Sequence, residues 1–331
     1  MVGRNQHGQI LTGDSWTSGF SVCWWVEGFR GERGQNDVYE MMSKNHDTDS
    51  SGMGGYDLII TKYQKMPIIT SVPVTHFSQA AFHRLGSVVT GLAFDIQNEL
   101  GRFLGEELYQ AELVRRLRLG GFDAEPEMKI IVRHGGFEKH YFVDILVDAG
   151  VIVETKAVES IGSSHRAQLI NYLYLCDLNH GTLLNFRTSR VQKVFVSTHW
   201  NSETRKIVKL DLEQWSPLTE RCDLLKRSLT ESLAEFGLGL DVVLYRDLIT
   251  HCLGGVSIVA GETEVFSGGV ILGTQKVHLL SPDVAFSITA SSQGSQNIRE
   301  HQRRFLSHTA LKAIQWINLT HEAVTFTTIR R

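Results

Sequence analysis

Apolar residues recur at three- and four-residue steps along residues 78–100, and this period predicts an amphipathic helix that Gly101 can end. The next helix is predicted to start at Gly105. Shorter apolar runs bounded by glycines favour strands further on. The predicted elements, in order, are helices over residues 78–100 and 105–119, strands over 128–132, 141–147 and 151–156, a helix over 165–176, and strands over 181–186 and 191–198. The order ααβββαββ indicates an α/β domain with one sheet and flanking helices.

The centre of this pattern is FVDILVDAGVIVETK, residues 142–156, in which two apolar runs flank a turn-forming triplet. A three-residue hairpin loop with Gly150 in the left-handed conformation pairs Val147 with Val151. The register of the whole hairpin follows from that pair, because side chains alternate between faces with a period of two.

Two acids and a lysine share one face of the predicted hairpin. Counting outward sets Asp144 opposite Glu154, with Cβ atoms about 5 Å apart. Lys156 lies two residues further along and shares their face. A half-buried strand face normally excludes such a cluster unless something binds it. The alternative is an exposed, salt-bridged hairpin, but the apolar run VIVETKAV favours a central strand.

Close carboxylates need a cation if both are to be ionised at neutral pH. Mg²⁺ takes oxygen ligands, typically one or two carboxylates with waters and substrate phosphates. Asp144 and Glu154 are the predicted ligands, and the carbonyl of Thr155 is a further one. A lysine such as Lys156 beside the metal can orient or deprotonate an attacking water. The cluster therefore predicts phosphodiester hydrolysis assisted by Mg²⁺ or Mn²⁺.

Four segments carry a resemblance to a known family: FDIQNELGRFLGEELYQAEL, FVDILVDAGVIVETKAVE, SSHRAQLINYL and GTLLNFR, within residues 82–190. They resemble the GxxExxY family of the PD-(D/E)XK nuclease superfamily. The resemblance implies a mixed central sheet flanked by helices, a divalent metal, and nucleic acid as the partner, with DNA favoured.

The resemblance also implies roles for individual residues. Asp144 and Glu154 correspond to the metal ligands and Lys156 to the catalytic lysine, while Glu106 and Gln168 complete the site. The aromatic positions of the motifs fall on Tyr109 and Tyr172, which we expect to be core residues. The leading glycine of the motif falls on Phe103, so the turn into the second helix departs from the pattern and Glu99 is the alternative helix acid.

Residues 206–331 repeat the order of elements, beginning with helices predicted over residues 218–236 and 241–253. The pair Gly135-Gly136 recurs as Gly268-Gly269, at an offset of 133. A period this long predicts two domain copies rather than a solenoid, and the alternative is chance agreement among short apolar strings.

The second half lacks the charged cluster. At the offset of 133, the positions of Asp144, Glu154 and Lys156 hold Val277, Ser287 and Thr289. We therefore expect three regions: a low-complexity or disordered segment over residues 1–77, a nuclease-like domain over residues 78–205, and a degenerate domain without a site over residues 206–331. The two copies are expected to pair within the chain or through a homodimer.

Composition changes this picture little. The net charge is −3, so a nucleic acid would be held by local patches such as the arginines of the second helix. The four cysteines are scattered, which favours free thiols in a reducing compartment. No apolar stretch is long enough for a membrane helix, and the first residues lack the apolar core of a signal peptide, so we expect a cytoplasmic protein without a membrane partner. The alternative to a nuclease is a non-catalytic module that binds nucleic acid or protein.

Overall fold

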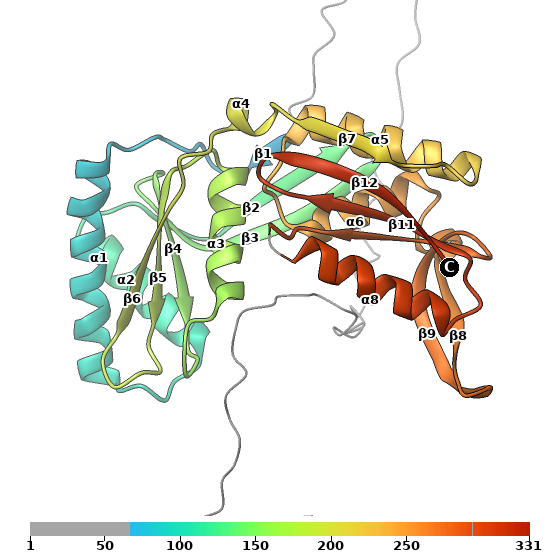
Figure 1. The fold of residues 1–331 in the computed structure, drawn as a ribbon. Helices are drawn as coiled ribbons and strands as arrows, with labels where there is room; N and C mark the ends of the chain where they lie inside the picture. The colour runs from blue at the N-terminus through green and yellow to red at the C-terminus, as the bar shows by residue number, and fades with distance from the viewer. Residues whose placement is uncertain (1–66, 293) are drawn as a thin grey trace, which may run out of the picture. The chain divides into compact units, whose positions relative to one another are not determined.

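The computed structural model describes residues 67–292 and 294–331, which belong to one compact unit (Figure 1). Most of the predicted low-complexity segment, residues 1–66, lies outside the described residues. Part of the same predicted segment is strand β1 (Ile68–Thr70), which pairs antiparallel with β2. The three-residue length of β1 explains why no alternating pattern marked it in the sequence.

The first sheet has the strand order β1-β2-β3-β4-β5-β6, with β4 and β5 parallel and every other neighbouring pair antiparallel. Its helices and strands confirm the predicted order ααβββαββ, and β2 and β3 are longer than predicted. After β1, the helices and strands of this half are α1 (Gln79–Leu100), α2 (Glu106–Leu119), β2 (Ala124–His134), β3 (Phe137–Val147), β4 (Val151–Lys156), α3 (Ser163–Leu175), β5 (His180–Asn185) and β6 (Gln192–Ser197).

Helices α1 and α2 cover one face of this sheet and α3 covers the other (Figure 1). Ser78 caps the start of α1, and Gly101 ends it with φ of 76°, a conformation that suits glycine. The hydroxyl of Tyr109 donates a 2.7 Å hydrogen bond to the carbonyl of Gly101, which fixes the turn between the two helices. Tyr109 is fully buried and stacks on Phe186, as expected of a core aromatic residue.

The predicted hairpin register is confirmed, since Val147 pairs with Val151. The left-handed residues of the loop are Asp148 (φ 46°) and Ala149 (φ 58°), however, and not Gly150 as predicted. Glycine is needed at position 150 for a different reason, which is that residues 75–77 approach it closely. A Cβ atom at Gly150 would lie 2.7 Å from the carbonyl oxygen of residue 75.

Replacing Gly150 with alanine should lower the free energy of unfolding by about 1–3 kcal/mol, because backbone atoms must move to admit the methyl group. Gly91→Ala is the matched control, since the added Cβ meets nothing within 4 Å on α1. That control should be more stable by about 0.5–1 kcal/mol, because alanine favours helix. Urea unfolding of both variants measures the difference, and equal stability of the two would contradict the close approach.

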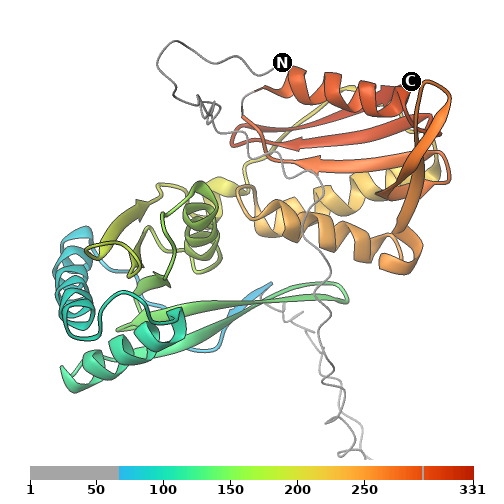
Figure 2. The ribbon, with the colours of Figure 1, turned by 90° about the horizontal axis from the view of Figure 1, so that it is seen from below.

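The second sheet has the order β7-β12-β11-β10-β9-β8, with β10–β11 and β12–β7 parallel and the other pairs antiparallel. In Figure 2, α8 lies on one face of this sheet and α5 and α6 on the other. The elements of this half are α4 (Ser202–Arg205), β7 (Lys209–Gln214), α5 (Glu220–Phe236), α6 (Val242–Cys252), α7 (Val256–Val259), β8 (Ala260–Ser267), β9 (Val270–Ser281), β10 (Val284–Thr289), α8 (Ser295–Ser307), β11 (Ala313–Leu319) and β12 (Ala323–Arg330). The chain is thus an α/β protein with two mixed sheets.

Two smaller expectations concern thiols and membranes. Cys176, Cys222 and Cys252 are free, and the first two are buried. Across the described part of the chain, we find no helix with the length and apolar character needed to cross a bilayer.

Candidate functional site

The site lies where β3 separates from β4. Their paired register ends at Ile145 and Val153, one residue before the predicted Asp144–Glu154 pair. Beyond that point, carboxylates accept the backbone hydrogen bonds. The amide of Asp144 donates to Oε1 of Glu154 (3.1 Å), and the amide of Thr155 donates to Oδ2 of Asp144 (2.8 Å). The two acids therefore lie in the gap between the strands, each held by a backbone amide.

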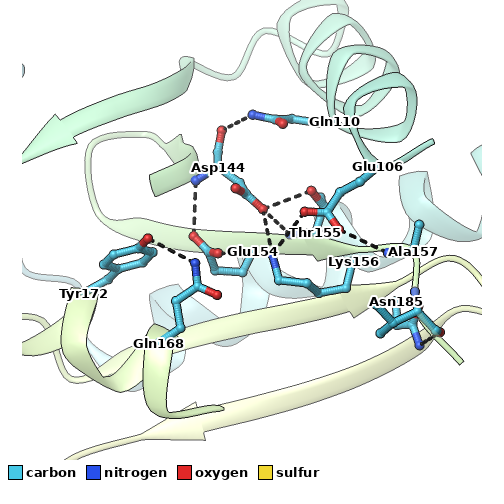
Figure 3. A network of polar contacts seen from close by, with 11 residues as sticks. Glu106, Gln110, Asp144, Glu154, Thr155, Lys156, Ala157, Gln168, Tyr172 and Asn185 are labelled. Carbon is cyan, nitrogen blue, oxygen red and sulfur yellow. Dashed lines mark hydrogen bonds and ion pairs between the residues drawn. The ribbon is translucent and has the colours of Figure 1, made fainter. Parts of the chain in front are cut away.

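Three acids surround the ammonium group of Lys156 (Figure 3). Its Nζ lies 3.2 Å from Glu106, 3.5 Å from Asp144 and 3.5 Å from Glu154. The side chain of Glu154 is 0% exposed, whereas that of Glu106 is 35% exposed. With all four groups ionised, the cluster carries more negative than positive charge, so it favours an additional cation.

Burial dominates the electrostatics of Glu154. Loss of hydration and the neighbouring charge of Asp144 raise the pKa of Glu154 from 4.5 to about 8, against the opposing effect of Lys156. Burial alone would lower the pKa of Lys156, but the charges of Glu154, Asp144 and Glu106 together raise it above its ordinary value. In the cluster, Glu154 therefore resists ionisation and the neighbouring Lys156 resists deprotonation.

This pKa shift predicts a pH dependence of stability. The folded chain holds a proton on Glu154 that the unfolded chain releases, so the stabilising contribution is complete below pH 4.5 and is lost as the pH rises through about 8. Glu154→Gln keeps the shape without an ionisable group. In the presence of a chelator, its free energy of unfolding should increase relative to the parent between those pH values. Parallel urea-unfolding curves for the two proteins across that range would contradict the shift.

Glu106 reaches the cluster from the first residue of α2, whose N-cap is Gly105. Its Oε2 also accepts a 3.2 Å hydrogen bond from the amide of Ala157, just past β4. The replacement of the motif glycine by Phe103 therefore does not remove Glu106 from the site. The alternative acid, Glu99, instead pairs with Arg116 at 2.6 Å and is outside the cluster.

Gln168 and Tyr172 face the cluster from α3 (Figure 3). Nε2 of Gln168 donates to the hydroxyl of Tyr172 at 3.0 Å. Among the hydrogen bonds of the described residues, none joins Gln168 to Asp144, Glu154 or Lys156. Burial raises the pKa of Tyr172 to about 12, so its hydroxyl stays protonated. The structure thus brings five of the predicted residues into contact, namely Glu106, Asp144, Glu154, Thr155 and Lys156, and sets Gln168 beside them.

Two residues near the site were not predicted. Gln110 lies one turn after Glu106 on α2, and its Nε2 donates a 2.6 Å hydrogen bond to the carbonyl of Asp144. Asn185 on β5 makes two hydrogen bonds to the backbone of Val158 and so holds the segment after Lys156. The signals were available in the sequence, since Gln110 follows Glu106 by four residues and Asn185 interrupts an apolar strand.

The donor atoms fit a hard divalent cation. Oε2 of Glu154 is buried and has no hydrogen-bond partner among the residues that the structure describes. The amide of Thr155 points toward Asp144, and the carbonyl of a strand residue lies on the same side as its amide. Within the described residues, no group of three or more His, Cys, Asp and Glu side chains could hold a metal. Two carboxylates completed by a carbonyl and waters are nevertheless a usual set for Mg²⁺.

Comparisons with known proteins agree with this geometry at the level of the superfamily. Residues 83–196 match a family model described as the PD-(D/E)XK nuclease superfamily, and all the predicted site residues fall in that range. The match does not single out the GxxExxY family. Searches of curated proteins and of solved structures gave no match. The chain therefore carries a PD-(D/E)XK nuclease superfamily domain at residues 83–196.

Proposed function

We propose that residues 78–205 form a metal-dependent nuclease domain that hydrolyses phosphodiester bonds of nucleic acid. One observation carries the proposal: a lysine ammonium lies within 3.5 Å of the carboxylates of Asp144 and Glu154, in the gap between two strands of a nuclease-superfamily domain. A buried charge cluster without a ligand is costly to keep, and such perturbed groups concentrate at functional sites. As finer proposals, we assign the domain to the GxxExxY family and favour DNA as its substrate.

Each residue of the cluster has a proposed role. Asp144 and Glu154 hold the cation, together with the carbonyl of Thr155. When bound, Mg²⁺ or Mn²⁺ would neutralise charge on the phosphate and make a bound water more acidic. Lys156 orients the attacking water and takes part in its proton transfer. Glu106 holds the ammonium of Lys156 from the other side, at 3.2 Å.

Gln168 has a supporting role in this proposal. Its side-chain amide is positioned by the hydroxyl of Tyr172, at 3.0 Å, and it faces the cluster from α3 (Figure 3). An amide offers both a donor and an acceptor. We therefore assign Gln168 to the orientation of the water or of a phosphate oxygen, after a small movement of its side chain.

A substrate panel tests the proposed function. The full chain is incubated with supercoiled plasmid, single-stranded DNA and RNA, with Mg²⁺ or Mn²⁺ and with a chelator. Cleavage of at least one substrate that depends on the metal supports the proposal. Metal-independent binding without cleavage of any substrate would instead favour a non-catalytic module that retains the fold.

We further infer that residues 206–331 are a degenerate copy of residues 78–205. The element order and the strand-pairing directions repeat, from β2–β6 to β8–β12. At the offset of 133, the residues packed under α3 map to residues packed under α8. Leu146, Ile152 and Leu183 correspond in this way to Leu279, Ala285 and Trp316.

Two hydrogen-bond arrangements recur as well and support the same inference. Asn318 makes a pair of bonds with the backbone of residue 291, as Asn185 does with Val158, again at the offset of 133. Between α5 and α6, the hydroxyl of Tyr245 donates to the carbonyl of Gly237, eight residues before it. Tyr109 and Gly101 make the same bond between α1 and α2. Specific buried polar pairs of this kind are hard to attribute to chance agreement of apolar strings.

The charged cluster has no counterpart among the described residues of the second half. Ser287 and Thr289 occupy the positions of Glu154 and Lys156. Their hydroxyls accept hydrogen bonds from Gln302 and from the indole of Trp316, at 3.2 and 2.9 Å. The polar groups at these positions are thus neutral rather than charged, and we assign a binding or assembly role to this half.

A further inference from the structure

The tip of the β2–β3 hairpin packs on α6 of the second half. Nζ of Lys139 lies 2.6 Å from Oδ2 of Asp247, and the ring of Phe137 lies 5.8 Å from that of His251, between centroids. Phe137 is only 8% exposed as a result. The β2–β3 hairpin therefore has its binding partner, a face of α6, within the same chain.

The corresponding hairpin of the second half, β8–β9, ends in an exposed apolar tip. Its glycine pair is followed by Val270, Ile271 and Leu272, which are 63%, 56% and 67% exposed. At the offset of 133, Val270 takes the place of Phe137 and Leu272 that of Lys139. A run of three consecutive exposed apolar residues is unfavourable in a soluble protein unless it serves a contact.

The corresponding helix face of the first half is also exposed. The two helix pairs align at an offset of 136, as fixed by their shared tyrosine–glycine hydrogen bond. Leu244 on α6 is fully buried, whereas its counterpart Leu108 on α2 is 55% exposed. A shallow, open surface groove of about 360 Å³ lies along the same helix, lined by Ala111, Val114, Arg115, Arg118 and Leu119.

The two exposed surfaces are chemically matched. Inside the chain, Lys139 meets Asp247 as an ion pair. If the β8–β9 tip packed on α2 in the same way, Leu272 would take the place of Lys139 and Ala111 that of Asp247. An ion pair is thus replaced on both sides by apolar residues. The two arginines of the groove keep partners in their own chain, since Arg115 pairs with Glu112 and Arg118 donates to the carbonyl of Ala124. This joint change favours a real contact between the β8–β9 tip and α2, since a charge facing an apolar partner would be costly.

We propose that the β8–β9 hairpin of one chain docks in the α2 groove of a second copy of this chain. The two surfaces are exposed in the same chain and so do not bind each other there. The contact reproduces, between chains, the packing of the β2–β3 hairpin on α6 within a chain. It joins different surfaces of the two partners, so assembly proceeds head to tail, and it ends as a ring where the rotation closes.

Sedimentation of the full chain over a range of concentrations tests the proposal. The parent should self-associate, and Leu272→Asp on the hairpin or Leu119→Asp in the groove should weaken association at least about tenfold. Both positions are more than 60% exposed, so the unfolding midpoints should stay unchanged. A parent that remains monomeric up to its solubility limit, or variants that associate as the parent does, would overturn the proposal.

Mixing and charge restoration sharpen the test. The hairpin variant keeps an intact groove and the groove variant keeps an intact hairpin, so their mixture should form a 1:1 complex that grows no further. L272K alone should disrupt association, and the double variant L272K/A111D should restore it by recreating the ion pair seen between Lys139 and Asp247. Failure of both the mixture and the double variant would show that the two surfaces do not meet.

Discussion

Replacing Lys156 with alanine should lower the rate of metal-dependent cleavage by about 10²–10⁴-fold, the range for loss of a positioned proton-transfer group. The same change should strengthen binding of Mn²⁺, by about tenfold or about 1.4 kcal/mol. The ammonium lies 3.5 Å from both proposed ligands and competes for their charge. Opposite effects on rate and on metal affinity distinguish a catalytic role from a structural one.

Single-turnover cleavage and calorimetric titration with Mn²⁺ measure the two quantities. Lys193→Ala is a suitable control, because this exposed lysine lies on β6 of the same sheet and outside the cluster. Lys156→Arg keeps the charge with a different geometry and should restore stability more than rate. The proposed catalytic role of Lys156 would be wrong if Lys156→Ala weakened metal binding and lowered stability but left the cleavage rate of the folded, metal-bound protein unchanged.

Loss of the Arg205 side chain should be the most destabilising single change considered for this fold. Arg205 is 1% exposed and donates to the carbonyls of Tyr174 and Leu238, each at 3.1 Å. It thereby joins the end of α3 to the segment after α5. Arg205→Ala leaves a cavity and removes the guanidinium donor from both carbonyls, of which Tyr174 keeps a backbone amide donor from Asp177, so the free energy of unfolding should fall by about 3–5 kcal/mol.

Arg205→Met separates the effect of the cavity from the effect of the lost hydrogen-bond donors. Methionine fills much of the space and avoids burying a charge, so the free energy of unfolding should fall less than in the alanine variant. Lys206→Ala, at the adjacent exposed position, should change stability by less than about 0.5 kcal/mol. Thermal and urea unfolding compare the three variants. Equal losses for Arg205→Ala and Lys206→Ala would contradict the assigned contacts.

Most of the first sheet could be predicted because its pattern is local. The period of α1, the glycine that ends it, and the alternation in β3 and β4 are all readable within a few residues. The hairpin register followed from loop length alone, and it brought Asp144 near Glu154 before any tertiary contact was known. The offset of 133, on which the proposed duplication rests, is also read from the sequence alone.

The remaining features depend on contacts between distant segments. The left-handed residues at 148 and 149 are not glycines, so their conformation could not be read from residue type. The need for glycine at position 150 comes from residues 75–77, about 75 positions earlier. Arg205 resembles an ordinary surface arginine in the sequence, and only its burial against Tyr174 and Leu238 reveals its role.

We propose above that the cluster of Asp144, Glu154 and Lys156 is a metal-dependent phosphodiesterase centre. The most direct test compares the full chain with Glu154→Gln, purified in parallel, for release of labelled fragments from nucleic acid in Mn²⁺ and in chelator. The parent should cleave in Mn²⁺ and not in chelator, and the variant should cleave in Mn²⁺ at a rate at least about 10²-fold lower. Equal rates for the two proteins, or no cleavage by either, would contradict it.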